Sequence, residues 1–164
     1  FYYLPNILDM SYMKTNEITI KPLTESDYFD WYKFWQAYLS FYKTVLTAEV
    51  TEATWSKILD HDVPIYGFGA FKGTKLVGIT HVVLHPNTWN TTDCCYLEDL
   101  YVDSAARGLG IGRMLIEQVY QFAEAHNCNR VYWVTNADNK TARYLYDKLA
   151  RQTDVVQYRK DLPL

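Results

Sequence analysis

The chain has 164 residues, of which 49% are apolar and 21% charged, with a net charge of −3 at neutral pH. These values describe one domain with an ordinary core, and they argue against a nucleic-acid-binding protein, which usually carries a basic surface. No apolar run reaches membrane-spanning length and no signal-peptide pattern appears, so we expect no membrane association.

The cysteines indicate the cellular compartment, and the first residues indicate where the domain begins. Three cysteines, two of them adjacent at Cys94 and Cys95, do not make a disulfide framework, because strand neighbours point to opposite faces. A reducing cytoplasm is therefore the expected location. The chain starts with Phe1. We expect a single domain over residues 13–164, preceded by an extension or by added residues at 1–12.

Apolar periodicity and turn residues predict alternating strands and helices. In chain order we expect a strand at 17–23, a helix from Tyr28 to Tyr42, a helix at 51–60 opened by Thr51, strands at 65–71 and 76–84 joined by a hairpin turn at 72–75, a strand at 94–102, a helix at 111–126, a strand at 130–135, a helix from the 136–138 cap to Leu149, and a last strand at 154–160. The order β-α-α-β-β-β-α-β-α-β predicts an α/β sandwich with one principal sheet.

The first helix carries an aromatic stripe that includes Trp31, Trp35 and Tyr38 at three-to-four spacing. Such a stripe is typical of a helix face packed on a core. Part of it could instead line a substrate channel, which makes Trp35 and Tyr38 candidate substrate contacts.

A glycine-rich turn, Arg107-Gly-Leu-Gly-Ile-Gly112, stands between the strand at 94–102 and the helix that follows. A glycine turn at a helix N-terminus presents backbone N–H groups and a positive dipole end, so it favours an anion such as phosphate. A P-loop would need Gly-Lys-Ser/Thr, but Gly112 is followed by Arg113. A dinucleotide fingerprint needs glycines at positions one, three and six, which the alternating glycines here do not match.

The spacing Arg107-x-x-Gly110-x-Gly112 resembles the acetyl-CoA pyrophosphate loop of the GCN5-related N-acetyltransferase (GNAT) family. A second motif, Asn139-x-x-Ala142-x-x-Leu-Tyr146, resembles the late helix of the same family. The resemblance covers residues 18–160 and implies the GNAT fold, a mixed, mostly antiparallel sheet with helices on both faces. Within the family, the chain is most similar to the spermidine/spermine and the histone-and-other-protein acetyltransferases.

This resemblance implies acetyl-CoA as the acetyl donor and assigns its contacts to the end of one strand, the glycine turn and the late helix. The implied cofactor-binding residues are Leu100, Tyr101, Val102, Arg107, Gly108, Leu109, Gly110, Ile111, Gly112, Arg113, Asn139 and Ala142.

The chemistry of amine acetylation explains two further residues. An alkylamine with a pKa near 10.4 is mostly protonated at neutral pH, so a base must remove a proton before or during attack. The resemblance implies that Glu98 is that base and that it acts through a water molecule. Alternatively, Glu98 only binds the substrate ammonium electrostatically. Tyr146 is the expected acid for the departing CoA thiolate, since a phenol with a pKa near 10 can protonate a thiolate. Tyr144 is its rival.

The acceptor is expected to be a small cationic amine, such as a polyamine, or a lysine-bearing peptide. Trp89, in a polar loop, is an expected substrate contact or alternatively a loop anchor, and Asp99 is expected on the strand face opposite Glu98. An aminoglycoside is the alternative acceptor, and a non-catalytic acyl-CoA sensor or scaffold is the alternative of another class. The resemblance also implies a homodimer, formed through the C-terminal strands, or a higher homo-oligomer.

Two other kinds of site are not expected. His81 and His85 share a strand face but have no third ligand nearby, so no metal site is predicted. No cysteine stands at a helix N-terminus beside a base, so direct transfer is expected rather than an acetyl-cysteine intermediate.

Overall fold

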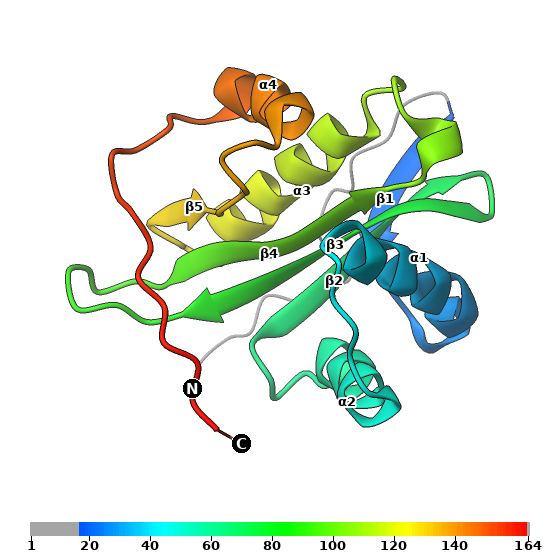
Figure 1. Ribbon diagram of the computed structural model, residues 1–164, viewed down its shortest axis with the longest axis horizontal. Coiled ribbons are helices and arrows are strands. Elements are labelled where there is room, and N and C mark those ends of the chain that lie inside the picture. The colour runs from blue at the N-terminus through cyan, green and yellow to red at the C-terminus, as the bar shows by residue number, and fades with distance from the viewer. Residues whose placement is uncertain (1–16, 164) are drawn as a thin grey trace. The chain divides into compact units, whose positions relative to one another are not determined.

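Five strands form one sheet in the order β1-β2-β3-β4-β5 in a computed structural model that describes residues 17–163 (Figure 1). The expected extension at 1–12 lies outside these residues. Neighbouring strands are antiparallel except for β4 and β5, which are parallel. This is the mostly antiparallel sheet that the resemblance implies. The strands are β1 (Ile18–Pro22), β2 (Ile65–Lys72), β3 (Lys75–His85), β4 (Cys94–Val102) and β5 (Arg130–Tyr132).

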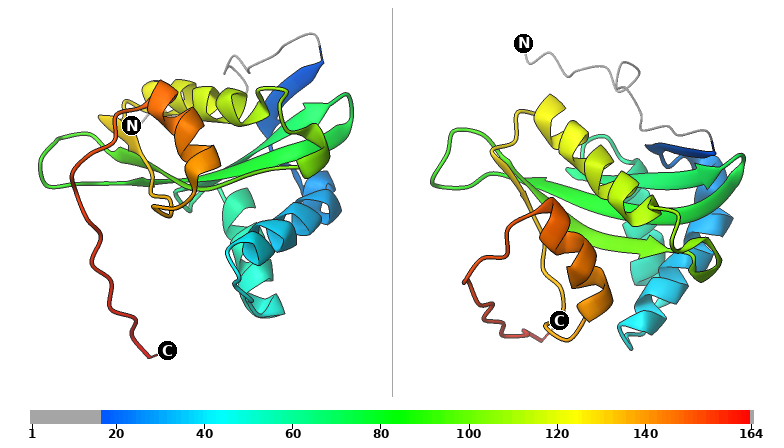
Figure 2. Two further views of the ribbon diagram at one scale, coloured as in Figure 1. Left: turned by 45° about the horizontal axis from the view of Figure 1, so that its top comes forward. Right: turned by 90° about the horizontal axis from the view of Figure 1, so that it is seen from above.

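The described residues divide into two compact units, one ending at Val134 and one beginning at Thr135. In the first unit, helices cover both faces of the sheet (Figure 2). One face carries α1 (Tyr28–Phe41) and α2 (Ala48–Leu59), and the other carries α3 (Ile111–Ala125). Short 3-10 turns at Glu25–Asp27 and Ser104–Ala106 lead into α1 and towards α3.

The aromatic stripe of α1 packs into the core on the first of these faces. Trp31 and Trp35 are buried, and their rings stack with centroids 5.8 Å apart. Trp55 of α2 lies 4.7 Å from the Trp31 ring, and Ile79 of β3 completes the cluster from the sheet. Burying large aromatic side chains in this way supplies much of the free energy that holds both helices on the sheet.

On the other face, a glycine brings α3 close to the sheet. A Cβ at Gly78 of β3 would lie 3.2 Å from side-chain atoms of both Ile111 and Leu115, and 3.1 Å from the Tyr101 carbonyl oxygen. A Cβ here would have to push its neighbours away by a few tenths of an ångström, so glycine favours the close packing of α3. The tight packing places the first turn of α3 beside the end of β4, where Gly78 pairs with Val102.

Two element bounds of the first unit differ from the expectation by more than one residue. The second helix begins at Ala48 rather than at Thr51, because the Thr47 hydroxyl accepts a hydrogen bond from the Val50 backbone N–H and caps it earlier. Strand β5 ends at Tyr132 rather than at 135, since its ladder with β4 covers only three residue pairs.

The second unit contains α4 (Lys140–Leu149), followed by residues 150–163 without regular secondary structure. The N-cap of α4 is Asn139 rather than the expected 136–138, because residues 136–139 form a turn in which the Asn139 N–H donates to the Asn136 carbonyl oxygen. The strand expected at 154–160 does not form. An alternating sequence becomes a strand only where another strand offers a hydrogen-bonding partner, and the sheet pairs no strand with these residues. Within residues 17–163, no helix combines the length and the apolar character that crossing a membrane requires.

Candidate active site

A β-bulge on β4 brings two carboxylates together. His81 of β3 pairs with Asp99, but the next residue of β3, Val82, pairs with Leu97, so Glu98 is an extra residue without a partner position. Regular alternation would send Glu98 and Asp99 to opposite faces, as expected from the sequence. A bulge interrupts that alternation.

Both carboxylates act on the face of the sheet that α1 and α2 cover. Asp99 shares this face with His81, and Glu98 interacts electrostatically with His81 and with Lys57 of α2. The expectation that Asp99 projects from the face opposite Glu98 is therefore wrong.

Asp99 is held by three neighbouring groups. Its Oδ2 lies 2.9 Å from Nδ1 of His81, and its backbone carbonyl accepts a hydrogen bond of 2.8 Å from the Thr80 hydroxyl. The third group is the hydroxyl of Tyr38 on α1, which lies close enough to the Asp99 carboxylate to be affected by its charge. Burial, and then the nearby charge of Asp99, raise the pKa of Tyr38 well above its usual value, so this phenol keeps its proton.

His81 itself is a residue that the sequence did not identify as part of the site. Its side chain is only 2% exposed, and its Nε2 lies 2.9 Å from the indole Nε1 of Trp31. The sequence does show one sign of its role, a polar residue inside an apolar strand. Such a residue is usually buried together with hydrogen-bond partners, because unpaired buried polar groups are rare. Those partners come from α1 and β4, which the local sequence does not show.

Glu98 sits in an environment that favours its neutral form. Its side chain still reaches solvent, but partial desolvation, and then the negative charge of Asp99, raise its pKa above the usual value. His81 and Lys57 act in the opposite direction. A carboxylate with a raised pKa is a stronger base, which suits proton removal from an amine.

The other expected substrate contacts differ in their exposure. Trp35 is buried and stacks on Tyr38 with ring centroids 5.5 Å apart, so these two belong to the same cluster as Asp99. Trp89 lies in the loop between β3 and β4, with 90% of its side chain exposed. An indole anchored onto the core would be buried, so the loop-anchor interpretation is wrong.

The glycine turn has the conformation that an anion site needs. Gly108 and Gly110 have φ angles of 82° and 75°, in the left-handed region that glycine adopts most easily. A Cβ at either position would meet no described atom within 4 Å, so the surface of the turn is open. Helix α3 starts here without a side-chain cap, which leaves backbone N–H groups of its first turn for a ligand.

Around this turn, the remaining expected cofactor contacts are placed as follows. Arg107 and Arg113 are exposed, and Arg113 makes an ion pair of 3.6 Å with Glu117, one helical turn later. The residues Leu100, Tyr101 and Val102 at the end of β4 are half-buried, Leu109 is exposed, Ile111 is buried and Gly112 is half-buried. The turn therefore combines open backbone amides with two cationic side chains.

In the second unit, Asn139 is the residue that precedes α4, and its side-chain amide donates to the Thr135 hydroxyl at 3.1 Å. Ala142 and Tyr146 are half-buried and follow Asn139 at spacings of three and seven, so all three lie on one face of the helix. Tyr144, the rival of Tyr146, is 70% exposed, with the Lys148 ammonium 3.8 Å from its ring.

Neither strand histidine has a nitrogen available for a metal. Both ring nitrogens of His81 are hydrogen-bonded, and those of His85 lie 2.8 Å from the Pro86 carbonyl oxygen and 2.6 Å from the Tyr132 hydroxyl. In residues 17–163 no group of three or more potential ligands gathers around a metal position.

Cys95 and Cys128 are poor nucleophiles. Burial raises the pKa of Cys95 to about 12 and that of Cys128 to about 11, so both remain thiols at neutral pH.

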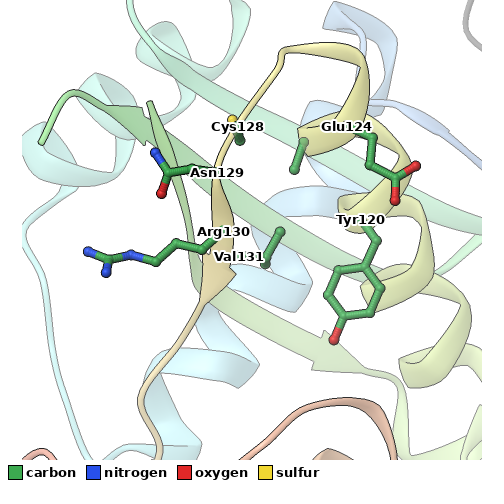
Figure 3. Close-up of a pocket in the computed structure, with 7 residues that line it drawn as sticks. Tyr120, Glu124, Cys128, Asn129, Arg130 and Val131 are labelled. Atoms are coloured by element: carbon green, nitrogen blue, oxygen red, sulfur yellow. The ribbon is translucent and has the colours of Figure 1, made fainter. Parts of the chain in front are cut away.

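A hollow of about 220 Å³ lies at the far end of α3 from the glycine turn. Figure 3 shows Tyr120 and Glu124 reaching from α3 and Val131 pointing toward them, while Arg130 points away. None of the residues expected at the site lines this hollow. It is therefore separate from the bulge and from the turn.

Comparisons with known proteins agree with this architecture. The profile of the Acetyltransferase (GNAT) family matches residues 23–150. The chain is 36% identical, over 91% of its length and 94% of the other protein's, to the D-amino-acid N-acetyltransferase HPA3 of Saccharomyces cerevisiae.

Solved structures show the same fold at lower identity. An aminoglycoside acetyltransferase from an uncultured soil metagenomic sample, meta-AAC0020, superposes with a TM-score of 0.74 at 21% identity, covering 90% of this chain and 98% of its own. The structure of AAC(6')-Iy with a CoA bisubstrate analogue superposes with a TM-score of 0.76 at 17% identity, covering 90% of this chain and all of its own.

Proposed function

The chain belongs to the GNAT acetyltransferase family and is an acetyl-CoA-dependent N-acetyltransferase, and on that premise we propose that it acetylates a small primary amine bound at the β4 bulge. The observation that carries the proposal is the pair Glu98 and Asp99 on one face of the sheet. Two carboxylates there attract a cationic amine, and the raised pKa of Glu98 equips it to take the amine's proton.

In the proposed reaction, Glu98 accepts a proton from the amine, directly or through a water. The freed nitrogen attacks the thioester carbonyl carbon, a C–N bond forms, and the C–S bond breaks. Tyr146 gives its hydroxyl proton to the departing sulfur, and the second proton that the nitrogen loses as the amide forms returns to the Tyr146 oxygen through solvent. The amine and the acetyl donor are bound together in this proposal, and it is supported by Cys95 and Cys128, which remain protonated and are therefore poor carriers of an acetyl group.

Each substrate has its own part of the site in this proposal. The open amides of the turn at 107–113 hold the pyrophosphate, while residues 100–102, with Asn139 and Ala142, contact the pantetheine arm. Trp35 and Tyr38 flank the amine, and Trp89 offers a flat surface to the rest of the acceptor. The family profile spans both units, which supports one functional domain over residues 13–164.

The first candidate acceptor is an α-amino acid, with D-amino acids ahead of others. It is supported by the 36% identity to HPA3, which extends over nearly the whole of both chains. Lys57, the cation that acts on Glu98 from α2, could pair with the carboxylate of such an acceptor.

A polyamine is the second candidate, favoured by the paired carboxylates, which suit a dication better than a zwitterion. Lysine side chains of basic proteins and aminoglycosides offer the same primary ammonium.

Release of free CoA thiol from acetyl-CoA tests these proposals in one panel. The panel contains D- and L-amino acids, spermidine, spermine, a lysine-rich peptide and an aminoglycoside. The acceptor with the highest kcat/KM identifies the class. Tight CoA binding by calorimetry, combined with no thiol release from any amine, would establish the sensor or scaffold instead.

We further propose a cytoplasmic, homodimeric protein. Its three cysteines are free, which agrees with a reducing compartment. Val155, Val156 and Tyr158 are exposed in the C-terminal segment and could pair with a second copy. Sedimentation of the full chain, compared with a chain ending at residue 153, tests the dimer.

A further inference from the structure

His81 makes a hydrogen bond with each of its two ring nitrogens, in the buried layer between β3 and α1. The indole Nε1 of Trp31 lies 2.9 Å from Nε2, and the Asp99 carboxylate lies 2.9 Å from Nδ1. An indole N–H can only donate, so Nε2 must carry a lone pair. The proton of the neutral ring is then on Nδ1, where it donates to Asp99.

We propose that Trp31 fixes the tautomer of His81, and that His81 thereby positions the Asp99 carboxylate to receive the ammonium group of the acceptor. The inference rests on the proposed function, because it needs an amine at the bulge. His81 is a positioning residue in this arrangement.

The bulge explains why Asp99 needs such support. At a bulge the backbone ladder is interrupted, so the ladder alone does not determine where the following side chain points. Two successive β3 residues hold Asp99 instead: the Thr80 hydroxyl donates to its carbonyl oxygen, and His81 donates to its side chain. Both β3 residues are almost completely buried, so water cannot replace these bonds at low cost.

The charges around Asp99 make the direction of the His81 bond important. Tyr38 of α1 lies near it, Glu98 precedes it on β4, and Lys57 of α2 acts on Glu98. With the proton on Nε2, the Nδ1 lone pair would face the carboxylate and repel it. By occupying Nε2, Trp31 excludes that tautomer.

His81 does not act as a base in this arrangement. Its ring is only 2% exposed, and the one nitrogen with a lone pair already accepts from the indole. A proton from the acceptor has no route to that atom.

Two amide substitutions separate the two hydrogen bonds of His81. In His81→Asn the amide nitrogen takes the place of Nδ1, so the donor to Asp99 remains. In His81→Gln the amide takes the place of Nε2, so a partner for Trp31 remains and the donor to Asp99 is lost.

For the best acceptor of the panel, we expect His81→Gln to raise the KM by about tenfold to a hundredfold, as for a partly buried carboxylate that loses a hydrogen bond. His81→Asn is expected to stay within about threefold of wild type. The KM for acetyl-CoA is expected to be unchanged in both. A merely structural role would lower the thermal stability of both variants without this contrast in KM.

Nitrogen NMR of the imidazole rings in the full-length protein tests the tautomer without any substitution. The chain has four histidines, and the His81 signal is identified by its absence in His81→Asn. We expect Nδ1 to be the protonated nitrogen. A proton on Nε2 would overturn the proposal.

Asp99→Asn distinguishes failure of this inference from failure of the proposed function. If Asp99→Asn raises the acceptor KM but His81→Gln does not, only the positioning role is wrong. If neither changes the acceptor KM, then Asp99 does not bind the amine, and the acceptor site of the proposed function is wrong as well.

Discussion

The Nδ1 atom of His81 lies 2.9 Å from Oδ2 of Asp99, at the point where the register between β3 and β4 shifts by one residue. The same shift leaves Glu98 as the extra residue of β4. A single irregularity of the sheet therefore brings a carboxylate held by hydrogen bonds next to a carboxylate with a raised pKa. The proposed division of labour, with Asp99 binding and Glu98 taking a proton, follows from that difference.

Glu98→Gln is expected to reduce kcat by about 10²- to 10⁴-fold, the usual contribution of a general base. Stability should not fall, because a carboxyl group with a raised pKa favours folding only in its neutral form, and at pH 7 the ionised group opposes folding. Steady-state kinetics and a thermal melt at pH 7 measure the two effects. A large drop in melting temperature would show that Glu98 has a structural role instead.

Asp99→Asn is expected to move the acid limb of the kcat/KM profile to lower pH. The negative charge of Asp99 helps to raise the pKa of Glu98, so removing that charge lowers this pKa. The base is then deprotonated, and active, at a lower pH than in the wild type. The measurement is a pH series with the best acceptor at low concentration. An acid limb that stays in place or moves upward would mean that Glu98 does not control it.

Gly110→Ala is expected to raise the KM for acetyl-CoA and to lower stability by about 1–2 kcal/mol, since a Cβ is unfavourable at a φ of 75°. Gly73→Ala is the matched control, because Gly73 has a φ of 61° but lies in the turn between β2 and β3. It should cost similar stability and leave the KM for acetyl-CoA unchanged. Equal KM values for the two variants would argue against a cofactor role of the turn.

Tyr146→Phe is expected to lower kcat by about 10²-fold or more while changing the acceptor KM little, because the phenol acts only when the thiolate departs. Tyr144→Phe is the control on the same helix, and its exposed ring predicts activity close to wild type. The comparison needs only kcat for each protein. A loss confined to Tyr144→Phe would exchange the two assignments.

Hydrophobic periodicity and turn chemistry predicted most of the fold, because these signals are local. The hairpin at 72–75, the aromatic face of α1 and the strand–turn–helix around Gly108 and Gly110 all depend on neighbours within a few residues. The segment at 154–160 has a strand-like pattern but no strand partner in the sheet, so local signals mispredicted it.

For the site, the sequence by itself identified the glycine turn and the acidic pair Glu98 and Asp99, since motif spacing is visible in one dimension. Only the tertiary structure decided that the two carboxylates lie on the same face of the sheet, because a bulge depends on how β4 aligns with β3. It also decided the role of His81. Its partner Trp31 lies fifty residues earlier in the chain, and only packing of α1 on the sheet brings the indole to the imidazole.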